Sequence, residues 1–193
     1  MMFSKVLSVA RKGEVHEIRV EFPREPKPGQ FVSVVLPGPK EVPLSVGDWE
    51  RDVLTLFVES DRLAKSFGRY VMVKGPLGRP LKLEGRRLVA IAFRNYVYDL
   101  NYVLKKAKEK GMEVYVKCYE CSSPYPEPQS LEGDLVIASV PKEMVKDLPK
   151  GTLVYSRWAE MNCMMGVCGK CLVGKRLACV DGPFLVVEDV VQG

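Results

Sequence analysis

The feature that most constrains this chain is a group of four cysteines near its C-terminal end. Cys163, Cys168, Cys171 and Cys179 follow the spacing C-x4-C-x2-C-x7-C. Four soft thiolates that converge from one short loop suit an iron–sulfur cluster, and C-x4-C-x2-C begins the plant-type [2Fe–2S] pattern, although the last gap is shorter here. Glycines between the first three cysteines let the backbone fold closely around a cluster. We therefore predict a [2Fe–2S] cluster bound by these four residues.

Other chemistries also use cysteine. Zinc binds four thiolates, but its usual sites combine two C-x2-C pairs, whereas this loop holds one such pair. Structural disulfides favour an oxidising compartment, and the N-terminal segment Met1–Lys5 has no secretory pattern, so we expect a cytoplasmic protein. A Rieske centre needs two histidines, and the chain has only His16. Zinc and disulfides therefore stay open as alternatives to the cluster.

Composition limits the classes of function. The 193 residues are 47% hydrophobic and 27% charged, as in an ordinary globular protein. The net charge of +5 is mild and its basic residues are interspersed with acidic ones, which argues against nucleic-acid binding. No apolar run approaches the ~20 residues needed to span a bilayer. The lone histidine lies in an alternating strand pattern, which favours a strand-surface residue over a catalytic one. Any chemistry is therefore expected to come from cofactors. Few Asn and Gln beside many Lys, Arg and Glu favour a thermophilic source.

The N-terminal part, residues 1–84, has the pattern of a small antiparallel β-barrel. Short β-branched segments, often alternating, are separated by turns rich in Pro and Gly. One short helix is expected near 61–67. The expected strands are 5–10, 14–22, 30–36, 52–59 and 69–74.

The middle part, residues 85–155, alternates strands and helices instead. Its β-α-β-loop-β-α-β order indicates a small parallel sheet with helices on its faces. The remaining residues, 156–193, are expected to form a helical turn, the cysteine loop, a hairpin over 172–177 and a tail. The expected strands of the middle part are 87–93, 112–118, 134–140 and 152–155, and its expected helices are 96–110 and 142–148.

The cysteines lie within a wider motif. The run Ser156–Cys171 and the sequence Cys-Val-Asp-Gly-Pro-Phe from Cys179 resemble the C-terminus of the dihydroorotate dehydrogenase electron transfer subunit family. Small subunits of sulfide dehydrogenase and ferredoxin–NADP oxidoreductase, and diaphorase subunits of hydrogenases, share much of this pattern. The resemblance implies an electron transfer subunit rather than a self-sufficient enzyme. It would pass electrons between a flavin and the cluster for a dihydroorotate dehydrogenase-type catalytic partner in pyrimidine biosynthesis.

Fragments of the N-terminal half agree with this family. Pro28–Val32, Val42–Val46 and Gly75–Gly78 resemble segments of a ferredoxin-reductase-type flavin barrel, the second being similar to its Arg-Pro-Leu-Ser motif. The resemblance implies a flavin-binding-type barrel over 1–84, a reduced, Rossmann-like nucleotide domain over 85–155 and a cluster-binding segment over 156–193. It also implies FAD contacts from Pro43, Leu44, Ser45, Ser60 and Gly75.

The flavin motif departs from the family in its charge. Val42 replaces an arginine that would pair with the FAD pyrophosphate, and valine cannot replace a bidentate cation. Residues 58–62 also lack the family's Gly-Lys-Gly-Thr, which would hold phosphate at a helix start. Arg51 or Arg62 could substitute, although acidic residues lie beside Arg62. The sequence therefore leaves FAD binding open.

The nucleotide domain lacks its phosphate-binding turn. No glycine lies between Gly85 and Gly111, although a pyrophosphate needs close backbone approach at the first strand–helix turn. NAD binding is therefore not expected. A non-enzymatic iron–sulfur sensor or relay that has lost FAD and NAD binding is the alternative function.

Two cysteines lie outside the cluster motif. Cys118 and Cys121 form a C-x2-C at the end of an expected strand. The Ser-Ser-Pro that follows opposes the helix that such a pair opens in thioredoxin-like proteins. Packed or free cysteines are favoured here, and a disulfide or a zinc ion shared with a partner chain are the alternatives.

Overall fold

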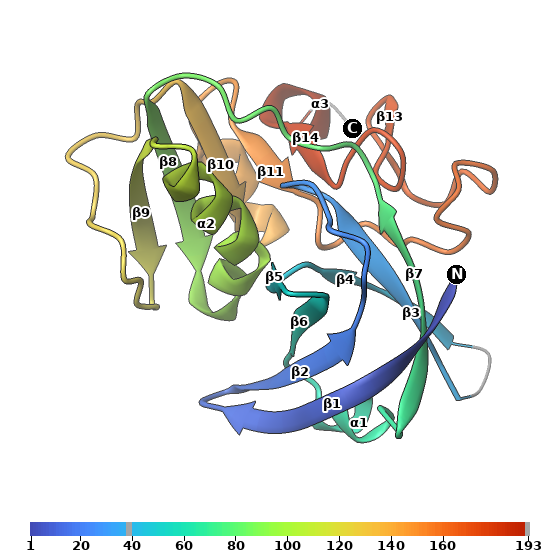
Figure 1. The fold of residues 1–193 in the computed structure, drawn as a ribbon. Coiled ribbons are helices and arrows are strands. Elements are labelled where there is room, and N and C mark those ends of the chain that lie inside the picture. The colour runs from blue at the N-terminus through green and yellow to red at the C-terminus, as the bar shows by residue number, and fades with distance from the viewer. Residues whose placement is uncertain (38–39, 192–193) are drawn as a thin grey trace.

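The computed structural model describes residues 1–37 and 40–191. Consecutive parts of the chain build two β-sheets, and the cysteine loop extends from the second one (Figure 1). The first sheet has seven strands in the order β4-β3-β7-β1-β2-β6-β5, and the second has five in the order β14-β11-β10-β8-β9. A two-stranded hairpin of β12 and β13 lies within the cysteine segment.

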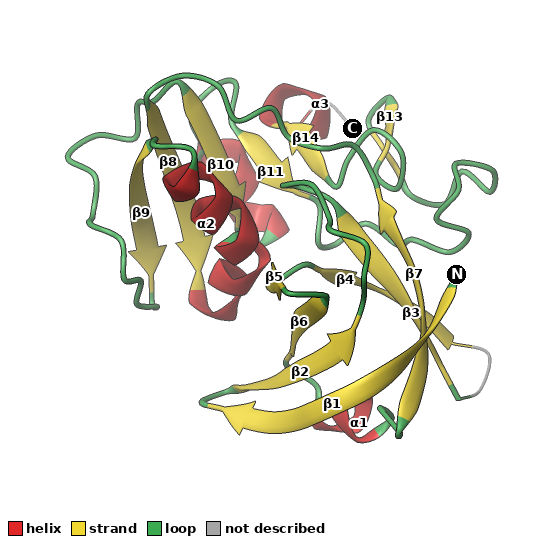
Figure 2. Ribbon diagram, viewed as in Figure 1, coloured by secondary structure: helices red, strands yellow, loops and turns green. Residues whose placement is uncertain are grey.

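The seven-stranded sheet is antiparallel throughout and curves around one side of the molecule (Figure 2), which confirms the antiparallel arrangement predicted for the N-terminal part. Helix α1 (Asp61–Lys65) connects β6 to β7 and is capped by Ser60, whose hydroxyl accepts the N–H of Leu63 at 3.1 Å. The strands are β1 (Met2–Lys12), β2 (Val15–Glu21), β3 (Phe31–Leu36), β4 (Lys40–Ser45), β5 (Asp48–Glu50), β6 (Val53–Val58) and β7 (Tyr70–Leu77).

Strand alternation explains the core of this sheet. In β6, Leu54 and Leu56 are fully buried while Val53, Thr55 and Phe57 are half-buried, as a period of two requires. Strands β4 and β5 were not predicted, because Pro and Gly surround them. Pro43 is tolerated in β4 because this strand lies at the edge of the sheet, where a missing N–H leaves no ladder position empty.

The five-stranded sheet is parallel over β9-β8-β10-β11, as predicted, and β14 joins it antiparallel to β11. Its helices are η1 (Arg94–Asp99) and η2 (Lys142–Asp147), both 3₁₀, and α2 (Asn101–Glu109) and α3 (Val187–Val191). The strands are β8 (Arg87–Phe93), β9 (Glu113–Tyr119), β10 (Leu135–Ser139), β11 (Leu153–Tyr155) and β14 (Phe184–Val186), and the hairpin strands are β12 (Leu172–Val173) and β13 (Arg176–Leu177).

In this half, one expectation was confirmed only in part and two were wrong. The helix expected over 96–110 is 3₁₀ as far as Asp99 and α-helical only from Asn101, because 3₁₀ turns are common at the start of α-helices. The helical turn expected at 156 is a tight turn in which the Ala159 N–H binds the Ser156 carbonyl at 2.9 Å. The expected tail contains β14 and α3, since pairing of β14 with distant β11 is invisible in local sequence.

The two sheets are joined by buried contacts. Tyr102 of α2 lies in the core of the first sheet and donates its hydroxyl to the Pro26 carbonyl at 2.7 Å. Gly78, after β7, has φ of +80°, and a Cβ there would lie 2.6 Å from the Gly182 carbonyl oxygen, so this approach requires glycine. Among the described residues, no helix is long and apolar enough to cross a bilayer.

Candidate functional site

A cavity lies between the two sheets at the predicted flavin motif. We call it the Ser45 cavity; its volume is about 280 Å³. It is bordered by the end of β4, by the end of β6 with the start of α1, and by the segment that follows β11. The lining residues are Val42, Pro43, Leu44, Ser45, Phe57, Val58, Glu59, Ser60, Leu63, Asp99, Tyr155, Ser156, Arg157, Ala159 and Met161.

The structure brings together most of the predicted flavin residues. Pro43, Leu44, Ser45 and Ser60 all line the Ser45 cavity. Gly75 lies outside its lining, in β7, where a Cβ would stand 3.1 Å from the side chain of Val32. Four of the five residues predicted to contact the flavin therefore lie at one place in the fold, and Gly75 lies apart from them.

A buried carboxylate anchors the cavity wall. Asp99, at the end of η1, has only 5% of its side chain exposed. Its Oδ1 accepts the Ser45 hydroxyl at 2.6 Å, and its Oδ2 accepts the Ser139 hydroxyl at 2.7 Å and Nη1 of Arg157 at 3.1 Å. These donors come from β4, from the end of β10 and from the turn after β11. Three hydrogen bonds make a charge at this depth tolerable.

Arg157 is the cation of the cavity, and it was not among the site residues predicted from the sequence. Its Nη2 lies 3.3 Å from Oε1 of Glu59, and its guanidinium stacks 4.3 Å above the ring of Tyr96. Burial alone would lower the pKa of Arg157, but the carboxylates of Asp99 and Glu59 outweigh it and raise the pKa. Arg51 and Arg62, the substitutes considered for the missing family arginine, do not line the cavity.

These residues suit a flavin ring better than a phosphate. The cavity lies at the lower limit of small-molecule pockets, which measure roughly 300–1,000 Å³. Leu44, Phe57 and Met161 supply apolar surface, and Ser45 supplies a hydroxyl, as a planar ring with polar edges requires. The charged lining is Glu59, Asp99 and Arg157, so acidic groups outnumber the single cation. The donor set thus fits an isoalloxazine ring and disfavours a diphosphate.

The four C-terminal cysteines lie in two pairs. Cys163 Sγ accepts N–H groups from Met165 at 3.5 Å and Cys168 at 3.4 Å, and the sulfurs of Cys171 and Cys179 are 3.2 Å apart. The N–H groups of Met165 and Cys168 lower the pKa of Cys163 to about 6. Burial raises the pKa of Cys179 to about 11. As metal ligands both residues would bind as thiolates, a form that Cys163 adopts more readily than Cys179.

This donor set fits a [2Fe–2S] cluster by its chemistry. Each iron of such a cluster takes two of the four thiolates. Here the sulfurs of Cys171 and Cys179 are neighbours, and the backbone N–H of Cys168 donates to the sulfur of Cys163. Within the described residues, no three or more Cys, His, Asp or Glu side chains are arranged as a ready metal site. The loop therefore presents four ligands of the type that a [2Fe–2S] cluster would need.

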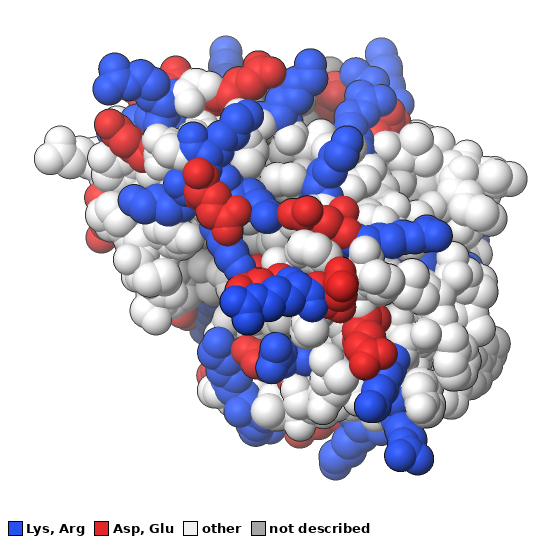
Figure 3. Space-filling model, viewed as in Figure 1, with Lys and Arg blue, Asp and Glu red and all other residues white. Residues whose placement is uncertain are grey.

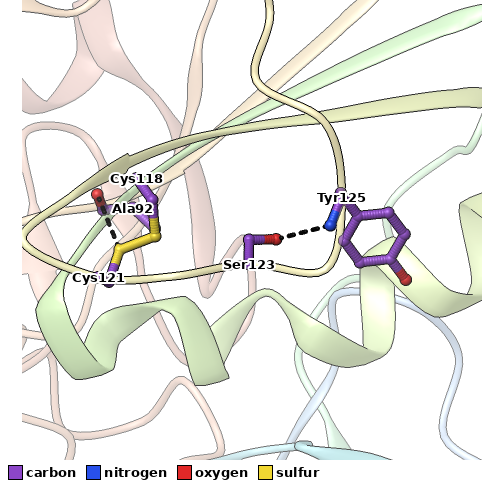
Figure 4. The surroundings of a disulfide bond; sticks show 5 residues. All are labelled: Ala92, Cys118, Cys121, Ser123 and Tyr125. Carbon is purple, nitrogen blue, oxygen red and sulfur yellow. Dashed lines mark hydrogen bonds between the residues drawn. A yellow bond between two sulfur atoms is a disulfide. The ribbon is translucent and has the colours of Figure 1, made fainter.

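The remaining cysteines are bonded to each other. Cys118 and Cys121 form a disulfide at the end of β9 (Figure 4), which corrects the favoured expectation of free or packed cysteines. Their Cα atoms are 5.3 Å apart, so the C-x2-C turn brings the sulfurs together. In the loop that follows, Ser123 Oγ accepts the Tyr125 N–H at 3.2 Å.

A second cavity, the Tyr125 cavity, lies beside this loop and has a volume of about 620 Å³. Phe57 lines both cavities and stacks on Tyr98 with ring centroids 4.3 Å apart, so this pair forms part of the wall between them. Lys105 at the Tyr125 cavity binds both oxygens of Asp48, at 2.8 and 3.0 Å. The charged residues that line the Tyr125 cavity are therefore largely paired with one another.

Comparison with solved structures defines the class of fold. The chain matches an NADH-dependent reduced ferredoxin–NADP oxidoreductase, described in a study of flavin-based electron bifurcation, with a TM-score of 0.77 and 20% identity over 96% of this chain and 88% of that chain. It also matches phthalate dioxygenase reductase, with a TM-score of 0.62 and 13% identity over 83% and 69% of the two chains. The fold is thus that of ferredoxin-reductase-like flavoproteins, as the sequence predicted.

Curated relatives narrow the resemblance. A probable dihydroorotate dehydrogenase B (NAD(+)) electron transfer subunit of Pyrococcus furiosus is 26% identical over 204 residues, covering 86% of this chain and 81% of the relative. A Methanopyrus kandleri protein of the same name is 26% identical over 223 residues, covering 91% and 85%. No family model matches the chain. These relatives confirm the resemblance inferred from the cysteine segment.

Proposed function

We propose that this chain is the electron transfer subunit of a dihydroorotate dehydrogenase-type complex in cytoplasmic pyrimidine biosynthesis. It would pass electrons between a flavin and a [2Fe–2S] cluster. One observation carries the proposal: a single chain with a ferredoxin-reductase-like fold contains both the Ser45 cavity and the four C-terminal cysteines. The names of the curated relatives support the same function.

The residues of the Ser45 cavity would hold the flavin. Pro43 and Leu44 would pack along its ring, and Ser60 would lie toward its polar chain; Gly75 stays a prediction from resemblance. A bound flavin exchanges electrons in pairs or singly, and a [2Fe–2S] cluster carries one at a time. Ser45, fixed by Asp99 at 2.6 Å, would present its hydroxyl oxygen as an acceptor at the ring edge. Cys163, Cys168, Cys171 and Cys179 would hold the cluster.

The surface around the cysteine loop suits a protein partner. Met165, Val167, Leu172 and Val180 are exposed there. Figure 3 shows that this side, on the right in Figure 1, carries few charges, whereas basic and acidic residues are intermixed over the face that holds α2. Exposed apolar side chains gathered at a redox loop are typical of an interaction site. A catalytic oxidoreductase subunit that covers this surface would bring its own cofactor near the cluster.

The experiment that tests the proposal is an absorption spectrum of anaerobically purified protein, with iron, zinc and flavin measured on the same sample. We expect about two irons per chain together with flavin bands, following the [2Fe–2S] stoichiometry. The variant Cys168→Ser should lose the iron, and Cys121→Ser, outside the cluster motif, should keep it. Zinc without iron would refute the redox assignment.

A relay or sensor that keeps the cluster without flavin is the second candidate. The acidic lining of the Ser45 cavity favours it, because Glu59 and Asp99 oppose the FAD phosphates and Val42 offers no cation. Iron–sulfur absorption with no flavin, even after incubation with FAD and FMN, would establish this candidate over the first.

A further inference from the structure

The surroundings of Asp99 correspond to a nucleotide-binding position. In open α/β sheets, dinucleotides bind outside the carboxyl ends of the strands, with the pyrophosphate at the first strand–helix turn. Here that turn is η1, between β8 and α2, and Asp99 is its last residue. Ser139 ends β10 and Arg157 follows β11, so both lie at the same edge of the sheet.

The chain supplies its own anion at this edge. Two hydroxyls and a guanidinium, which are groups that bind phosphate oxygens, all donate to the carboxylate of Asp99, at 2.6, 2.7 and 3.1 Å. The second terminal nitrogen of Arg157 is directed to Glu59. A pyrophosphate would therefore meet donors that are already satisfied and two carboxylates that repel it.

The residues of η1 add a steric barrier. Arg94, the first residue of the turn, has φ of +47°, a region that glycine favours. Tyr96 stacks on Arg157, and Tyr98 stacks on Phe57 across the sheet interface. These contacts fix bulky side chains where a dinucleotide needs close approach to the main chain.

We infer that Asp99 determines specificity, by holding in cis the position of a nucleotide pyrophosphate and so excluding pyridine nucleotides. This inference deepens the proposed function: the chain exchanges electrons with proteins and not with NADH. It contrasts with the curated relatives, whose names include NAD(+). The exclusion itself is a binding property and does not depend on a loaded flavin or cluster.

The test is calorimetric titration of the purified chain with NADH and, separately, with inorganic pyrophosphate. Asp99→Asn keeps the shape of the side chain, removes its charge and frees the guanidinium of Arg157. We expect no measurable NADH binding by the wild type, and binding of inorganic pyrophosphate at least tenfold tighter by Asp99→Asn than by the wild type, because the small anion does not need the close approach that the tyrosines block. Asp147→Asn, an exposed aspartate on η2, is the matched control and should behave as the wild type.

Two results would overturn the inference. One is measurable binding of NADH by the wild type; the other is binding of pyrophosphate no tighter by Asp99→Asn than by the wild type, which would remove Asp99 as the determinant. If circular dichroism shows that Asp99→Asn is unfolded, Asp99→Ser takes its place, with Asp99→Glu as the charge-retaining variant that should stay unresponsive. Failure of the proposed function would instead appear in the iron and flavin contents, which this titration does not use.

Discussion

The pair of Asp99 and Arg157 allows a quantitative test of the cavity wall. Replacing Arg157 by Met keeps much of the side-chain volume but leaves the carboxylate of Asp99 with the hydroxyls of Ser45 and Ser139 alone. Removing one partner of a buried ion pair typically costs roughly 3–5 kcal/mol. Because Arg157 is 33% exposed and two donors remain, we expect a loss of about 2–3 kcal/mol in the free energy of unfolding.

The assay is a double-mutant cycle of Arg157→Met, Asp99→Asn and their combination, with guanidinium unfolding followed by circular dichroism. We expect a coupling energy above about 1.5 kcal/mol, since Asp99 lies in a low-dielectric site. The matched control is the pair Arg176 and Asp189, 3.3 Å apart with side chains 51% and 39% exposed. Exposed pairs contribute about 0.2–1 kcal/mol. Equal coupling in the two cycles would refute the view of Asp99 as a buried anchor.

Two further predictions concern the hydrogen bond between Tyr102 and Pro26 and the disulfide between Cys118 and Cys121. Tyr102→Phe leaves the Pro26 carbonyl without its 2.7 Å partner and should lower the free energy of unfolding by about 1–2 kcal/mol. Tyr70→Phe, at an exposed site, should change it by under about 0.5 kcal/mol. Similar values for the two variants would contradict a stabilising role of the Tyr102 hydrogen bond. Thiol titration of denatured, metal-free, unreduced protein should count four free thiols and six after reduction, and six at the outset would disprove the Cys118–Cys121 bond.

The local periodicity of the sequence predicted most strands of both sheets. Alternation in β2 and β6, and the continuous apolar run of β8, directly reflect one-sided and two-sided burial. The elements that were missed depend on distant partners. Strand β4 contains a proline and forms only because β3 pairs with it along six positions, and β14 completes the sheet beside β11, about thirty residues earlier in the chain.

The candidate site shows the same limit in its chemistry. Motif order indicated Pro43, Leu44, Ser45 and the cysteines, because each motif is continuous in sequence. Asp99, in contrast, meets Ser45 across 54 positions and Arg157 across 58, so no window of sequence contains the pair.

A signal was nevertheless present in the sequence: one acid, Asp99, stands next to Leu100 at the start of an otherwise apolar helical face. The absent glycines of η1 agree with the inferred role of Asp99. Because the side-chain donors at this edge of the sheet already bind Asp99, they offer nothing further to the pyrophosphate of a pyridine nucleotide. The local rule broken in η1 is thus consistent with one long-range network of contacts within the chain.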